Sequence, residues 1–199
     1  MKSILPYIVF GLLVAQLLLM PLSWLYSAAF PSAGVHSLLS GEGLRWFFGH
    51  FADIISTPFL VWIILFAMAY GAFVGSGAGS LLTNRLRAQS YRERRALALS
   101  ATFLVVYIAL MLLFTITPQA VLLSASGTLW PSPFSHSLVP VVAFGITVFS
   151  GIYGLIAGRF LTPADVCDSL LQGIRQFAPM LLVYVLLAQF YYSLRFVLP

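Results

Sequence analysis

The side chains that could bind a metal or carry out acid–base chemistry are few and scattered. The chain has three histidines, His36, His50 and His136, and a single cysteine, Cys167. A metal site needs several His, Cys or carboxylate ligands at fixed spacing, and the sequence has no such cluster. We therefore predict no metal site and no cofactor, and we interpret the unpaired cysteine as a packing residue.

One pair of residues has the spacing of a base and an orienting acid. His50 and Asp53 lie one helical turn apart if the segment around them is helical. Nucleophilic catalysis also needs a serine or cysteine beside the base, and a solvated polar helix face explains the pair more simply. Because no apolar segment contains an acid–base set, we predict that the protein is not an enzyme.

Inside the apolar segments, six polar side chains remain as candidates for contact with a solute. No charged group lies in the middle of these segments, whereas a transporter coupled to protons or sodium usually buries one at mid-membrane. We expect each of the six to form hydrogen bonds between helices. They are Gln16, Ser76, Tyr107, Thr147, Ser150 and Gln189.

Glycines at helical spacing form the clearest positive pattern. They recur at Gly71, Gly75 and Gly79 and again at Gly151, Gly154 and Gly158. Small residues three or four positions apart let two membrane helices approach closely, so we predict helix packing at these faces. Gly77 adds a further glycine, and the alternative is local unwinding that exposes the backbone to a ligand. That alternative makes Ser76, Gly77 and Gln189 part of a substrate path.

The scarcity of polar residues extends to the whole composition. Hydrophobic residues make up 61% of the chain, charged residues 8%, and the mean hydropathy is +1.00, whereas soluble domains carry about 25% charged residues. A bilayer-spanning helix needs about 20 mostly apolar residues. We predict an all-α integral membrane protein with about five spans, forming a single transmembrane domain over residues 1–199. The predicted spans are Leu5 to Ala28, Pro58 to Leu82, Leu97 to Thr117, Leu138 to Ala157 and Ala178 to Val197.

Pro118 and the turn-rich segment 124–133 separate the third and fourth spans. The first span has features of a signal peptide, namely Lys2, an apolar run and small residues at 27–29. Because this apolar run is longer than the usual apolar region of a signal peptide, we expect the span to be retained.

Two further segments are amphipathic. Between the first two spans, helical spacing gathers Leu44, Phe47, Phe48, Phe51 and Ile55 on one face and Glu42, Arg45, Trp46, His50 and Asp53 on the other. We expect this helix to lie flat on the outer membrane surface, with Ser40 capping its N-terminus. Before the last span, Thr162, Pro163 and Asp165 have the spacing of a capped helix start.

Basic residues indicate the orientation. Five of the ten basic residues lie in one predicted loop, at Arg85, Arg87, Arg92, Arg94 and Arg95. Such residues remain in the cytosol and attract anionic lipid headgroups. With the N-terminus inside, eight Lys and Arg residues are cytoplasmic and two are outside, so we predict that the C-terminus is outside. We exclude nucleic-acid binding because the loop lacks interleaved aromatic residues.

Three stretches of the sequence carry a resemblance to a known family. The first comprises Leu38 to Trp46, Ala69 to Ala72 and Ser80 to Leu82; the second, Ser132 to Pro140 and Gly151 to Gly158; the third, Ala164 to Val166 and Leu187 to Phe190. In this order they resemble the p-aminobenzoyl-glutamate transporter (AbgT) family of bacterial inner-membrane transporters. None of these stretches is a catalytic motif.

The resemblance implies a membrane transporter, typically dimeric, for p-aminobenzoyl-glutamate uptake or sulfonamide export. Family members are much longer and have re-entrant hairpins that nothing in this sequence resembles, so no substrate-binding or ion-coupling residue is transferred. Our leading hypothesis is a compact AbgT-like transporter of an anionic solute, a homodimer in the bacterial inner membrane. The alternative is a non-transporting scaffold or accessory subunit that keeps only the helix-packing elements.

Overall fold

A computed structural model describes residues 4–80, 90–116 and 133–198 of the chain. Throughout these residues the regular structure is helical, without strands. Five helices are long and apolar enough to cross a bilayer, as the composition predicts. The chain is therefore an all-α, multi-pass membrane protein whose apolar helices contact lipid. The five helices are α1 (Leu5–Ala29), α4 (Pro58–Gly75), α6 (Tyr91–Ile116), α7 (Pro133–Ala157) and α8 (Pro163–Val197).

The first helix, α1, matches its prediction to within one residue. It begins with a proline in its first turn, where the missing N–H has no intrahelical partner to lose. Its 25 residues are about 38 Å long at 1.5 Å per residue. This length exceeds the hydrocarbon thickness of about 30 Å, so α1 is long enough to extend from one interface to the other.

The second span, α4, ends at Gly75, earlier than the predicted Leu82. Residues 76–78 form a turn, in which Gly77 has φ of 77°. Glycine adopts this left-handed conformation without the steric penalty of a Cβ atom. The helix of the predicted span is therefore interrupted at Ser76, next to Gly77, where local unwinding was the alternative; hydropathy alone is insensitive to such a change of backbone conformation.

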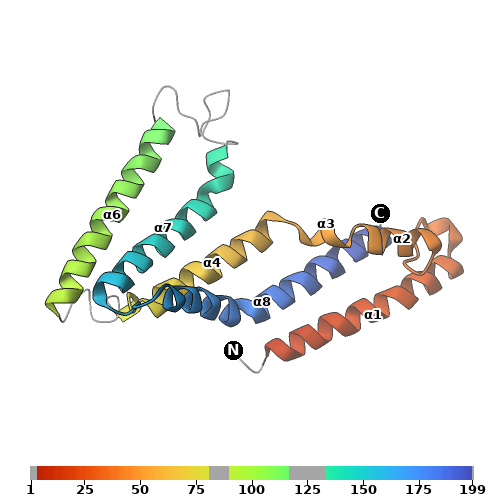
Figure 1. Ribbon diagram of the computed structural model, residues 1–199. Coiled ribbons are helices and arrows are strands. Elements are labelled where there is room, and N and C mark those ends of the chain that lie inside the picture. The colour runs from red at the N-terminus through yellow and green to blue at the C-terminus, as the bar shows by residue number, and fades with distance from the viewer. Residues whose placement is uncertain (1–3, 81–89, 117–132, 199) are drawn as a thin grey trace. The chain divides into compact units, whose positions relative to one another are not determined.

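The hairpin of α6 and α7 also differs from its predicted limits. The two helices lie side by side (Figure 1). α6 begins at Tyr91 instead of Leu97, so three of the predicted loop arginines occupy its first turns. The Glu93 carboxylate accepts a hydrogen bond from the Ser90 N–H at 3.3 Å, which satisfies a backbone donor at this helix start. Pro118 and segment 124–132 lie outside the described residues.

The predicted outer amphipathic helix is divided in two. α2 (Gly41–Gly49) and α3 (Phe51–Ile55) meet at His50, which ends one and precedes the other. The capping prediction is confirmed, since Ser40 Oγ accepts a hydrogen bond from Gly43 N–H at 3.0 Å. The aromatic Trp46 stacks on Phe196 with 4.4 Å between ring centroids. One side of α2 therefore packs on α8, and its position at the membrane surface stays a prediction.

The last helix, α8, joins the predicted amphipathic segment and the last predicted span into one helix. Its 35 residues contain Pro179 and extend for about 52 Å, more than the hydrocarbon thickness. The predicted start is confirmed: Asp165 N–H donates to Thr162 Oγ1 at 3.3 Å, and the Asp165 carboxylate accepts from Thr162 N–H at 2.8 Å. This reciprocal cap fixes the beginning of the helix.

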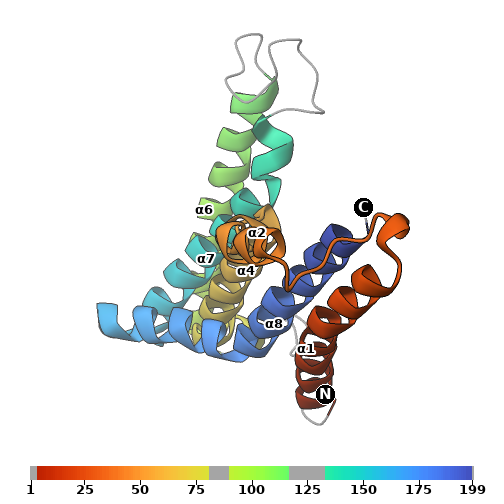
Figure 2. The ribbon, with the colours of Figure 1, turned by 90° about the vertical axis from the view of Figure 1, so that its right-hand side faces the viewer.

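The chain forms two compact units, which are described separately. Unit 1 comprises Met1–Val61 and Ala178–Pro199, and unit 2 comprises Trp62–Phe177. In unit 1, α1 and the C-terminal part of α8 lie side by side (Figures 1 and 2). Unit 2 contains the hairpin of α6 and α7 with the remaining parts of α4 and α8. The single transmembrane domain over residues 1–199 stays a prediction.

Candidate functional site

Polar atoms that are buried without a hydrogen-bond partner mark the positions where a solute could bind. Among the described residues these atoms are Gln16 Oε1, Ser150 Oγ, Gln189 Nε2 and Gln189 Oε1. An unsatisfied polar group in a hydrocarbon environment costs several kcal/mol. A group of this kind in a natural protein therefore calls for an explanation, such as an interacting ligand.

In unit 1, α1 and α8 meet along a polar seam, formed by Gln16, Gln189 and Ser193. The Gln16 amide donates to Ser193 Oγ at 3.0 Å. Gln189 precedes Ser193 by one helical turn and therefore lies on the same face of α8. Only 5% of Gln189 is exposed, yet both polar atoms of its amide lack a partner among the described residues. The seam thus offers amide donors and acceptors inside an apolar helix pair.

Hydrogen bonds from Tyr184 hold the start of α4 against α8 within unit 1. The Tyr184 hydroxyl pairs with the hydroxyl of Thr57 and donates to the Ile55 carbonyl oxygen at 3.4 Å. Tyr184 lies on α8 between Pro179 and the polar seam. These bonds link the segment before α4 to α8.

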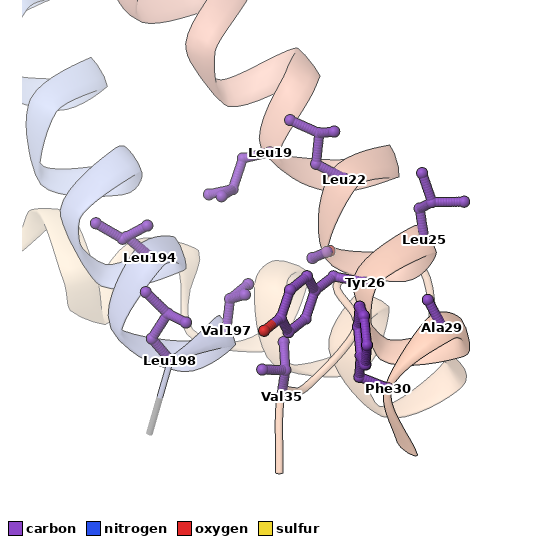
Figure 3. A pocket seen from close by; sticks show the side chains of 11 residues that line it. Leu19, Leu22, Leu25, Tyr26, Ala29, Phe30, Val35, Leu194, Val197 and Leu198 are labelled. Carbon is purple, nitrogen blue, oxygen red and sulfur yellow. The ribbon is translucent and has the colours of Figure 1, made fainter. Parts of the chain in front are cut away.

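A groove of about 390 Å³ lies between the ends of α1 and α8, with Tyr26 and Phe30 along one wall (Figure 3). Leu194, Val197 and Leu198 contribute from α8. The hydroxyl of Ser23 in the lining is already used, because it donates to the Met20 carbonyl at 2.8 Å and accepts from Leu38 N–H at 3.1 Å. The groove therefore suits a hydrocarbon chain better than an anion.

In unit 2, the predicted path residues Ser76 and Gly77 form the turn that ends α4. Ser76 is fully buried; its hydroxyl donates to the Phe73 carbonyl at 3.0 Å and accepts from Ala78 N–H at 3.3 Å. The hydroxyl is therefore used within the turn. Gln189 belongs to unit 1, so the structure gives no position for it relative to Ser76 and Gly77.

The first glycine set lies at a close contact between α4 and α8 within unit 2. A Cβ atom added at Gly71 would overlap the Ser169 carbonyl oxygen, and one added at Gly173 would overlap the Ala67 carbonyl oxygen. The Cβ position of Gly75 lies against the Ser169 side chain. Sequence reasoning missed the α8 partners, although Ser169 and Gly173 have the same four-residue spacing. That spacing was the available signal.

The other predicted glycines have different surroundings. A Cβ position at Gly79 faces only the Phe73 ring, at 3.5 Å, whereas one at Gly151 has no atom within 4 Å. Gly154 faces the Phe160 ring and Ser76, in unit 2. Gly158 follows the last residue of α7, has φ of 79° and lies against the Arg92 side chain. Gly151 therefore makes no close helix contact within unit 2.

The predicted arginine cluster is only partly described. Arg92, Arg94 and Arg95 lie in the first turns of α6, and Arg85 and Arg87 lie outside the described residues. Arg92 Nε donates to the Ile156 carbonyl oxygen at 2.8 Å. This carbonyl belongs to the last turn of α7, where intrahelical donors are missing. Arg92 therefore links the two helices of the hairpin.

Comparison with known proteins adds one finding. The sequence model of the AbgT putative transporter family matches residues 71–196, which is more than half of the chain. The matched segment begins at Gly71 and includes Ser150, Gln189 and Ser193, whereas the similarity noted for residues 38–46 lies outside it. Neither the curated proteins nor the solved structures contain a significant match.

Proposed function

The chain belongs to the AbgT putative transporter family, and from this membership we propose that it moves a small anionic solute across a membrane. The proposed solutes are p-aminobenzoyl-glutamate, in uptake, or a sulfonamide, in export. The observation that carries the proposal is the buried, unpaired amide of Gln189, which lies inside the segment matched by the family. A transient ligand would satisfy an amide that the resting protein leaves without a partner.

The chemistry of the seam suits these solutes. A carboxamide presents two N–H donors and a carbonyl acceptor, and the unpaired Oε1 of Gln16 adds a second acceptor. p-Aminobenzoyl-glutamate has an aryl amide and carboxylates, and a sulfonamide has an amine and sulfonyl oxygens. Each solute can therefore accept from Gln189 Nε2 and donate to a glutamine oxygen. In this proposal, Ser76 and Gly77 form the turn that ends α4 and do not bind the solute.

The proposed setting is the bacterial inner membrane, with the N-terminus inside and the C-terminus outside. The support is the distribution of basic residues, eight cytoplasmic and two outside in this orientation. We further propose a homodimer, because five spans enclose little space by themselves and Gly151 has an open face. Crosslinking of Gly151→Cys tests this interface, and monomeric products alone would contradict it.

Transport is tested with the purified full chain in sealed vesicles containing labelled p-aminobenzoyl-glutamate or a labelled sulfonamide. We expect wild-type flux under a proton or sodium gradient and at least tenfold lower flux for Gln189→Leu. The matched control is Gln176→Leu, because Gln176 is exposed and makes only a long 3.5 Å contact to Tyr70. Absence of wild-type flux of both solutes under every gradient would refute the transport proposal.

The alternative is a scaffold or accessory subunit that does not transport. The close contact of Gly71 with Gly173 supports it, since this contact serves helix packing alone. Under this alternative, wild-type vesicles show no flux, and Gln189→Leu changes only stability. Wild-type flux, together with the effect of Gln189→Leu on flux and stability, therefore distinguishes the two functions.

A further inference from the structure

A small basic pocket lies at one end of the hairpin in unit 2 and shares no residue with the polar seam. It has a volume of about 260 Å³ and is lined by Tyr91, Arg92, Arg95, Leu99 and Ile156. We propose that this pocket binds the phosphate of an anionic phospholipid, with Arg95 and Arg92 as its ligands. The proposal does not depend on whether the protein transports a solute.

The first argument is the state of the two guanidinium groups. Arg92 is held in place by its Nε bond to the Ile156 carbonyl oxygen, so its terminal nitrogens are positioned in advance. The left-handed Gly158 permits this, because a Cβ atom there would lie 2.7 Å from the Arg92 guanidinium carbon. A guanidinium group presents N–H donors in a planar fork that matches a phosphate.

The second argument is the lack of a competing anion. Arg95 lies over the Tyr91 ring, with 5.8 Å from its guanidinium carbon to the ring centroid, and forms no ion pair with the described residues. Glu93 is the only carboxylate in the first turns of α6, and it caps the Ser90 N–H. The pocket therefore contains positive charge and no carboxylate in its lining.

The third argument is depth, and it favours a lipid over free phosphate. Residues 96–116 of α6 carry no charge and extend for about 31 Å at 1.5 Å per residue. This length matches a hydrocarbon core of about 30 Å, so Arg92 and Arg95 lie at the level of the headgroups. Leu99 and Ile156 give the pocket an apolar side, which suits the glycerol and upper acyl chain. Basic pockets between membrane helices bind anionic headgroups in this way.

The experiment measures lipid binding to the full chain in detergent by native mass spectrometry, with phosphatidylglycerol and phosphatidylcholine as probes. We expect wild-type protein to prefer phosphatidylglycerol and Arg95→Gln to bind it about fivefold more weakly, the effect of one basic residue near a membrane surface. The matched control is Arg175→Gln, which removes an exposed arginine of unit 2 outside the pocket. It should retain wild-type affinity.

Three results would overturn the proposal: equal affinity for the two lipids, unchanged affinity in Arg95→Gln, or the same loss in Arg175→Gln. Inorganic phosphate is the separate arm for a soluble ligand. If phosphate displaces the bound lipid at millimolar concentration, the pocket is a free-anion site and the lipid assignment is wrong. If Arg95→Gln does not fold, Arg95→Lys decides: intermediate affinity supports the proposal, and wild-type affinity contradicts it.

Discussion

Both compact units use α8, but the helix makes contacts of opposite character in each. In unit 2 it meets α4 through Gly71 and Gly173, where a Cβ atom added to either glycine would overlap a backbone oxygen of the other helix. In unit 1 it meets α1 through the polar seam, where Gln16 donates to Ser193 and the Gln189 amide lacks a partner among the described residues. The glycine contact of unit 2 needs no further partner, whereas the polar seam of unit 1 contains buried amide atoms without a hydrogen-bond partner among the described residues.

We infer from this difference that the part of α8 in unit 2 contributes to stability and the part in unit 1 to function. Helix association in lipid gains little from the hydrophobic effect, so close packing at glycines is a main source of stability. Unpaired amide atoms do the reverse, because they destabilise the resting protein. We therefore attribute the architecture of unit 2 to the glycine contact and any solute binding to the polar seam of unit 1.

The largest expected effect comes from filling the glycine contact. Gly173→Ala should destabilise the protein by about 3 kcal/mol, the upper end for overpacking, because the added Cβ overlaps the Ala67 carbonyl oxygen. Backbone atoms cannot rotate away as a side chain can. This effect exceeds the gain of about 1 kcal/mol in helix propensity. Thermal unfolding in detergent measures the change.

Gly11→Ala is the matched control for that substitution. The same propensity gain applies in α1, and no atom lies within 4 Å of the added Cβ. The control should be neutral or more stable by up to about 1 kcal/mol. Equal unfolding temperatures for the two variants would eliminate the proposed role of the glycine contact.

The second expected effect has the opposite sign and concerns the seam. Gln189→Leu should stabilise the resting protein by about 1–2 kcal/mol, because it replaces an unpaired buried amide with an apolar group of similar size. The same variant is expected to lose flux. Destabilisation instead would show that Gln189 has a structural partner, and the seam would then resemble the glycine contact. Unfolding in detergent and vesicle flux are measured on the same preparation.

The smallest expected effect is the coupling between Gln16 and Ser193. A double-mutant cycle with Gln16→Leu and Ser193→Ala should give about 0.6 kcal/mol, the average for hydrogen bonds between membrane helices. The value is small because the partners find other hydrogen bonds when the helices separate. Strict additivity of the two substitutions would mean that the 3.0 Å bond contributes nothing to the contact of α1 with α8.

Features that depend on residues close together in the sequence, namely the spans and the helix caps, were predicted correctly. Hydropathy over about 20 residues is enough to locate spans, and the five predicted spans correspond to five helices. Capping depends on residues three positions apart, so both caps, at Ser40 and at Thr162 with Asp165, are confirmed. The helix ends at Gly75 and Tyr91 were missed, because they depend on turn geometry and side-chain bonds.

Apolar length and cap spacing by themselves determined that this chain is a multi-pass helical membrane protein, since both act within a few turns of one helix. Only the tertiary structure decided which atoms remain unpaired. Gln16 and Gln189 looked equivalent as polar residues in apolar segments. The Gln16 amide nitrogen donates to Ser193, whereas both polar atoms of the Gln189 amide lack a partner among the described residues. Such pairing joins residues far apart in sequence, and no local pattern encodes which faces of two helices will meet.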